Sequence, residues 1–147
     1  MENQFKGRSL LPGVVRGQVS VGLDVDIKKF QIVKNNLVYC CKESTLNQKV
    51  LYGKVLCVKS FKGEISDDSL LLNLICKSNL PSCILVADKL PDFFLSVLAF
   101  IKNLYTTSLI VVDNLGDEFL DSLNSGDIVS VCDDTVSIQQ DKLNEKF

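Results

Sequence analysis

The sequence predicts an α/β fold, with a β-rich N-terminal third followed by alternating strand and helix units. Short apolar runs typical of strands occur at residues 55–58, 82–88, 108–113 and 127–132. The runs at 82–88 and 108–113 are almost continuous, as in strands that are covered on both faces. Segments with apolar residues at helical spacing separate these runs, and such alternation implies right-handed parallel crossovers.

The N-terminal third contains several strand signals. Residues 7–13 end in a Pro-Gly turn, and residues 14–21 then alternate in part between apolar and polar side chains, which indicates a half-buried strand. Residues 30–33 and 37–41 are shorter apolar runs among polar turns. We therefore expect additional β-hairpin material beside the parallel crossovers.

The stretch at residues 55–76 is typical of a strand, a polar turn and an amphipathic helix. We expect Ser66 or Asp67 to cap this helix by accepting a hydrogen bond from a backbone N–H group. Leu70, Leu71, Leu74 and Ile75 recur at helical spacing, so we expect them to form the stripe that faces the core.

Two further helices and a closing hairpin are predicted. Pro91 suits the first turn of the second helix, and the third helix begins near Asp117 and ends before a Ser-Gly pair. Residues 127–132 and 135–138 flank an Asp-Asp turn and are expected to pair as a hairpin.

Length and composition indicate one soluble domain. The 147 residues, of which 46% are hydrophobic and 23% charged, are enough to bury a core without disulfides. We expect a single domain over residues 1–147, with its core at about 6–138 and a polar tail at 139–147. The net charge of −2, without a basic run or a long apolar span, gives no reason to expect nucleic acid or a membrane as a partner.

The six cysteines are expected to be reduced thiols in a cytoplasmic protein, because the N-terminus lacks the apolar segment of a signal peptide. Cys57, Cys83 and Cys132 lie in strand-like runs, where cysteine acts as a small hydrophobic residue. Cys40 and Cys41 are adjacent, so in a strand they point to opposite faces and do not easily hold one ion. No Cys-x-x-Cys motif is present, and we expect no metal site in this chain.

The sequence contains no histidine. This absence excludes Ser-His-Asp and Cys-His catalysis, a histidine metal site and a phosphohistidine carrier, since each of them needs an imidazole. Any acid–base chemistry must use other groups.

Residues 62–69 are the first candidate site, because ligands of open α/β layers bind beyond the carboxyl end of a strand and next to a helix N-terminus. Lys62 and the free N–H groups of the helix can attract a carboxylate or a phosphate. Glu64 carries a carboxylate that is a ready base at neutral pH. The alternative interpretation is a capped core helix without chemistry.

Several motifs occur together in an order that matches one family. They include a Pro-Gly start within residues 7–17, a Lys-Gly pair before a Leu-Leu helix within 62–73, a strand entry at 79–86 and a late Gly-Asp-x-Val strand within 123–131. Over residues 6–138 the chain resembles the small swivel domain of the aconitase-X family.

The resemblance implies a swivelling β/β/α domain, aconitase swivel-like in fold, that closes over a separate and larger subunit. That large subunit would hold an iron–sulfur cluster, and this chain would hold no cofactor. Such a complex would be a lyase of the hydro-lyase type, inactive as the small subunit alone. Its substrate would be a small hydroxy acid similar to cis-3-hydroxyproline or to phosphomevalonate.

The chain departs from the family pattern in the candidate loop. Family members carry a Gly-Ser-x-x-Gly-Ser-type loop before the Leu-Leu helix, and one of its serines is regarded as the proton acceptor. An alignment without gaps through Gly63 places Glu64 and Ile65 at the first serine positions, and Asp67 and Asp68 at the second Gly-Ser pair. The expected serine is therefore missing.

Two classes of function remain open. In the first, Glu64 or Ser66 is the proton acceptor of a dehydratase subunit, and the substrate is bound by Lys62, Gly63 and Ser69. In the second, the chain is a non-catalytic swivel domain that serves as an interaction or regulatory module. The phosphohistidine domain of phosphoenolpyruvate-utilising enzymes shares the Pro-Gly start and the Gly-Asp-x-Val strand, but the lack of histidine excludes it.

Overall fold

The computed structural model describes residues 3–104 and 108–139. The helices in this part of the chain are α1 (Asp68–Lys77), α2 (Asp92–Leu104) and α3 (Asp117–Asp121), with single 3-10 turns η1 (Ile27–Lys29) and η2 (Ile65–Asp67). The strands are β1 (Asn3–Lys6), β2 (Arg8–Leu11), β3 (Val14–Val21), β4 (Asp24–Asp26), β5 (Phe30–Val33), β6 (Asn36–Tyr39), β7 (Val55–Val58), β8 (Ser60–Lys62), β9 (Cys83–Val86), β10 (Ile110–Asp113), β11 (Ile128–Cys132) and β12 (Thr135–Gln139). Of the predicted tail at 139–147, Gln139 instead ends β12, and residues 140–147 lie outside the described residues.

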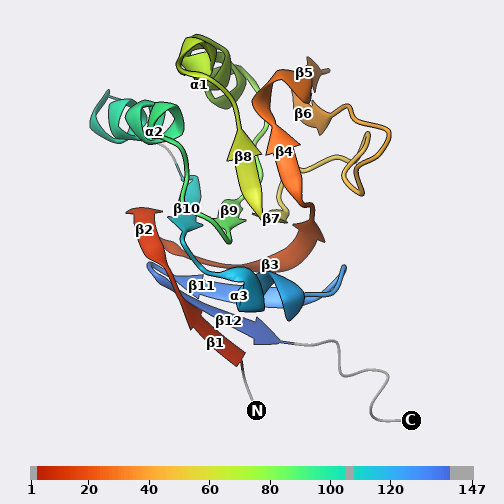
Figure 1. Ribbon diagram of the computed structural model, residues 1–147, viewed down its shortest axis with the longest axis vertical. Coiled ribbons are helices and arrows are strands. Elements are labelled where there is room, and N and C mark those ends of the chain that lie inside the picture. The colour runs from red at the N-terminus through yellow and green to blue at the C-terminus, as the bar shows by residue number, and fades with distance from the viewer. Residues whose placement is uncertain (1–2, 105–107, 140–147) are drawn as a thin grey trace.

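The main sheet has the strand order β1-β12-β11-β3-β7-β9-β10-β2. Strands β3, β7, β9 and β10 are parallel to their neighbours in this series, which confirms the predicted crossovers. Strands β11 and β12 form the predicted antiparallel hairpin, and β11 continues the sheet to β3. Helices α1 and α2 lie together on one side of the parallel strands, whereas α3 lies with β11 and β12 on the other side (Figure 1).

The sheet curls back on itself at Gly7. Strands β1 and β2 stand at opposite ends of the strand order, yet only Gly7 separates them in the chain. The Gly7 N–H group donates to the carbonyl oxygen of Asp134 over 2.9 Å. A Cβ atom at this position would collide with the carbonyl oxygen of Asp113, so the close approach requires glycine.

Two hydrophobic cores lie on the two sides of the parallel strands. Side chains alternate between the faces of a strand, so Leu56 and Val58 of β7 pack in the core beneath α1 and α2. Val55 and Cys57 pack in the second core, inside the curled sheet and beside α3. Every residue of β7, β9 and β10 is buried, as the continuous apolar runs predict.

The cysteines are only partly as predicted. Cys57 and Cys83 are buried, and burial raises the pKa of both thiols, that of Cys83 to about 12. They are therefore protonated and act as small hydrophobic residues. The same prediction is wrong for Cys132, which is exposed because it lies on the outward face of β11.

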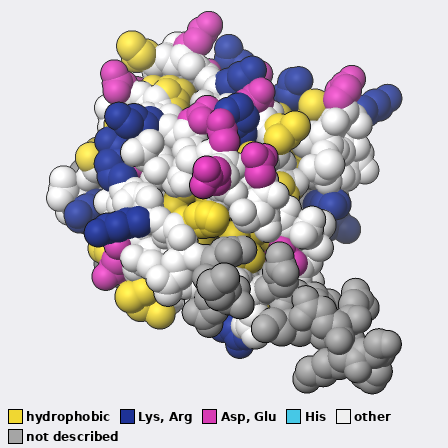
Figure 2. Space-filling model, turned by 60° about the horizontal axis from the view of Figure 1, so that its bottom comes forward, with side chains coloured by type: hydrophobic (Ala, Val, Ile, Leu, Met, Phe, Trp, Pro, Cys, Tyr) yellow, Lys and Arg dark blue, Asp and Glu magenta, His cyan; other side chains and the backbone are white. Residues whose placement is uncertain are grey.

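Charged side chains of both signs lie around a smaller hydrophobic area on the face in Figure 2. Among the described helices, none has the length and apolar character needed to cross a membrane.

An ion pair between the partly exposed Arg8 and the buried Asp113 joins β2 to β10. Arg8 donates from Nε to Asp113 Oδ1 over 2.9 Å and from a terminal nitrogen to Oδ2 over 2.6 Å. The Leu90 N–H group donates to the same Oδ2 over 2.7 Å. The Asp113 side chain is fully buried, and its hydrogen bond to Arg8 raises the pKa of that guanidinium. Asp113 thus connects the edge strand, the parallel sheet and the segment that leads into α2.

We expect Arg8→Ala to destabilise the protein because it leaves the buried Asp113 carboxylate without its counter-charge. The expected loss in free energy of unfolding is about 2 kcal/mol, less than for a fully buried pair since Arg8 is partly exposed. Urea unfolding measures it. Arg16→Ala is the control, because Arg16 bonds the exposed Gln139 and should change stability by less than about 0.5 kcal/mol. Equal stability of both variants would contradict the prediction.

Candidate functional site

The candidate loop, residues 62–69, is carried beyond the carboxyl ends of the parallel strands. Strand β8 follows β7 almost directly and pairs in parallel with β4, which follows β3. The loop then passes through η2 into α1. The sequence did not indicate β4 and β8, because three-residue strands show no periodicity.

Asp67 fixes the shape of the loop. Its buried carboxylate accepts a hydrogen bond from the Glu64 N–H group over 2.8 Å, and its own N–H group donates to the Glu64 carbonyl oxygen over 2.8 Å. The expected capping of α1 by Ser66 or Asp67 is wrong, because the Asp67 side chain turns back to Glu64 and no side-chain bond caps the helix.

Gly63 allows the loop to lie against α2. A Cβ atom there would stand 2.6 Å from Phe93 Cζ and 3.2 Å from Asp67 Oδ2. The ring of Phe93 is buried in the core beneath the helices. Gly63 therefore has a packing role, whatever its part in binding a substrate.

The lysines of the loop region are already engaged by carboxylates. Lys62 Nζ lies 3.7 Å from Asp24 Oδ2. The Ser60 hydroxyl donates to Asp24 over 2.5 Å and is the main reason why the pKa of Asp24 is lowered, with the charge of Lys62 as a smaller cause. Lys28 Nζ lies 3.9 Å from Asp67 Oδ2 and 4.0 Å from Glu64 Oε2. The sequence analysis missed Lys28 and Asp24, which reach the loop only through tertiary structure.

The two candidate proton acceptors face solvent. The Glu64 side chain is 75% exposed, and Ser66 is also exposed. Ser69 donates from its backbone N–H and from its hydroxyl to Asp68 Oδ1, over 2.6 and 3.3 Å. The structure thus brings Lys62, Gly63, Glu64, Ser66 and Ser69 into one surface loop but does not enclose them.

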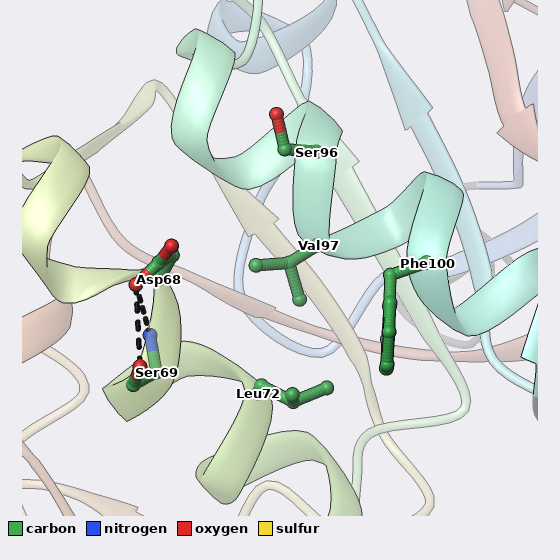
Figure 3. A pocket seen from close by; sticks show the side chains of 6 residues that line it. All are labelled: Asp68, Ser69, Leu72, Ser96, Val97 and Phe100. Atoms are coloured by element: carbon green, nitrogen blue, oxygen red, sulfur yellow. Dashed lines mark hydrogen bonds between the residues drawn. The ribbon is translucent and has the colours of Figure 1, made fainter.

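A groove of about 200 Å³ adjoins the loop between α1 and α2. Asp68 and Ser69 stand at one end, and the side chains of Leu72, Val97 and Phe100 meet between the helices (Figure 3). The groove offers a carboxylate and an apolar floor, and its lining includes no basic residue to receive an anionic substrate.

The chain provides no donor set for an iron–sulfur group in the part that the structure describes. Among residues 3–104 and 108–139, no group of three or more Cys, His, Asp or Glu side chains is arranged so that it could hold a metal ion. What the loop can supply is a carboxylate or hydroxyl as proton acceptor.

Comparison with known proteins identifies the family. The family described as the aconitase X swivel domain matches residues 4–139. This chain belongs to the aconitase X swivel domain family. No curated protein matches the sequence.

Solved structures agree with this family's fold. The chain is similar to one from the crystal structure of Thermococcus kodakaraensis aconitase X in its holo form, with a TM-score of 0.73 and 20% identity over 94% of this chain and 99% of that one. It is also similar to a UPF0107 protein solved by NMR in solution, with a TM-score of 0.71 and 18% identity over 94% and 100% of the chains. The predicted swivel-like α/β fold is confirmed.

The late Gly-Asp-x-Val motif has a structural role in this swivel domain. Asp127 is buried, and its carboxylate accepts from the Asn124 N–H group over 2.8 Å. Its carbonyl oxygen accepts from the Val19 N–H group over 2.9 Å, and Val129 is fully buried in the inner core. This motif positions the closing hairpin and lies outside the candidate loop.

Gly63→Ala is expected to lower the free energy of unfolding by about 1–3 kcal/mol, because the new methyl group overlaps the Phe93 ring. Chemical unfolding of four proteins, namely wild type, Gly63→Ala, Phe93→Leu and the double variant, measures the coupling. The smaller leucine makes room, so the double variant should be more stable than the sum of the single changes implies. If the changes in free energy of unfolding of the two single variants simply add in the double variant, Gly63 does not have this packing role.

Proposed function

We propose that this chain is the small subunit of an aconitase-X-type hydro-lyase and that residues 62–69 close over a larger partner subunit. The observation that carries the proposal is the exposure of a well-anchored loop: Glu64 and Ile65 are 75% and 79% exposed although Asp67 and Gly63 fix the backbone beside them. A proton acceptor works in a site from which water is excluded, so this loop needs a second surface to cover it.

A solved swivel-domain chain supports a two-subunit arrangement. The similar chain of the Thermococcus kodakaraensis structure is covered to 99%, so it has about the same length as this one. We place the iron–sulfur cluster in the larger subunit, because the described residues of this chain offer no ligand cluster for it.

In this proposal the complex dehydrates a small hydroxy acid similar to cis-3-hydroxyproline or phosphomevalonate, in the cytoplasm. Glu64 or Ser66 accepts the proton, and Lys62, Gly63 and Ser69 contact the substrate. The anionic group of the substrate competes with Asp24 for Lys62, since the two side chains are paired at 3.7 Å. Asp24 therefore lowers the affinity of the loop for anions.

A second candidate is a non-catalytic swivel domain that acts as an interaction or regulatory module. It is favoured by the acidic character of the loop: Lys28 contacts carboxylates, and Asp68 stands at the mouth of the groove. A loop of this charge is less suited to an anionic substrate.

Co-purification from the native cell tests the arrangement. The proposed function predicts that the tagged chain recovers a larger subunit that contains an iron–sulfur cluster, which its absorption spectrum shows. Recovery of the chain alone at its native concentration contradicts a two-subunit enzyme.

In a reconstituted complex, replacement of the proton acceptor should lower turnover at least ~100-fold with little change in stability. The variants are Glu64→Ala and Ser66→Ala, and steady-state dehydration of the hydroxy acid is the measurement. Asp68→Ala is the matched control in the same loop and should have a much smaller effect. Unchanged turnover in both variants, or no turnover by the wild-type complex, favours the non-catalytic module.

A further inference from the structure

Three chemically different side chains meet at a site away from the candidate loop. The Lys29 ammonium donates to Cys41 Sγ over 3.7 Å, and the Cys41 thiol donates to Glu43 Oε2 over 3.3 Å. Lys29 ends η1, and Cys41 and Glu43 follow β6. The cluster therefore combines a nucleophile, a cation and a carboxylate in one contact group.

The backbone holds this cluster in place. The Cys40 N–H group donates to the Lys29 carbonyl oxygen over 2.9 Å, which continues the pairing of the β5–β6 hairpin. The Cys41 N–H group donates to Asn47 Oδ1 over 2.9 Å. The first bond places Lys29 beside Cys40 and so close to Cys41, and the second fixes the backbone of Cys41.

Electrostatics within the cluster agree with this geometry. The pKa of Lys29 is raised, chiefly by the charge of Cys41. The pKa of Glu43 is lowered, first by its own backbone N–H group and then by the Cys41 thiol. A thiol that is accessible and next to a lysine has the surroundings of reactive cysteines.

Four of the other five cysteines provide a contrast. Cys57 and Cys83 are buried and protonated, which makes them inert. Cys76 and Cys132 are more exposed than the half-buried Cys41, but the described part of the chain places no charged group in contact with their sulfur atoms. Among the described residues, contact with a lysine and a carboxylate thus belongs to the half-buried Cys41, whereas Cys76 and Cys132 are the more exposed thiols.

We propose that Cys41 is a site of reversible oxidation by hydrogen peroxide, activated by Lys29 and Glu43. Cys41 Sγ attacks one peroxide oxygen as its proton passes to Glu43, and the O–O bond breaks. The second oxygen takes that proton and leaves as water. The sulfur is oxidised by two electrons to a sulfenic acid, the peroxide is reduced, and a thiol reductant restores the cysteine.

Trapping of the sulfenic acid tests the proposal. The full-length, reduced chain is treated with hydrogen peroxide in the presence of dimedone, and mass spectrometry measures the labelling rate of each cysteine. We expect Cys41 to be labelled fastest, ahead of the more exposed Cys76 and Cys132. Equal or faster labelling of either exposed cysteine overturns the proposal.

Substitutions distinguish the effect of the Lys29 and Glu43 contacts with Cys41 from a general effect of nearby charge. Lys29→Gln should slow labelling of Cys41 by about threefold to tenfold, the effect of losing a solvent-screened opposite charge. Glu43→Gln should also slow it, because the proton acceptor is lost, whereas Lys29→Arg should retain most of the rate. Lys42→Gln is the control, since it removes a neighbouring charge, whereas the hydrogen bonds of the sulfur within the described residues are to Lys29 and Glu43. An unchanged rate in both Lys29→Gln and Glu43→Gln, or an equal loss in Lys42→Gln, overturns the proposal.

Discussion

The structure depends on the burial of strands β7, β9 and β10 on both faces. Each residue of these strands packs into one of two cores, beneath α1 and α2 or inside the curled sheet. Polar groups cannot occupy such positions without partners, because an unpaired polar group in a core is costly. Within these three strands, unpaired polar groups are therefore excluded, and the candidate loop lies beyond β7, where β8 leads into it.

The same constraint explains the one charge buried at the end of β10. Asp113 is stable there because Arg8 and the Leu90 N–H group both bond its carboxylate. The pair holds β2 against β10, while the bend at Gly7 carries β1 to the opposite end of the sheet. A single interaction thus supports the closure of the sheet and the approach to α2.

The candidate loop combines a rigid backbone with outward side chains. Asp67 and the contact between Gly63 and Phe93 hold it in place, and Glu64 points into solvent. A preorganised loop of this kind loses little conformational freedom when it binds a partner surface. Lys62 and the neighbouring Lys28 are paired with carboxylates, so binding of an anion involves an exchange of partners.

Much of the fold was predictable from local patterns. Apolar runs and helical stripes indicate which faces of a segment are buried. From them the sequence predicted β7, β9, β10, α1, α2 and the closing hairpin. The candidate loop was also found, since it follows a strand and precedes a helix. The prediction failed for Cys132, because its run does not show which face of β11 is turned outward.

The sequence by itself determined the order of the longer strands and of the three helices, the lack of imidazole chemistry and the position of the loop. Only the tertiary structure decided the pairing of β4 with β8, the turn of Asp67 back to Glu64, and the contacts of Lys28 and of Lys29. The reason is physical. Periodicity records only whether each face of a segment is buried, whereas these contacts join short segments whose partners are selected by the packing of the whole chain.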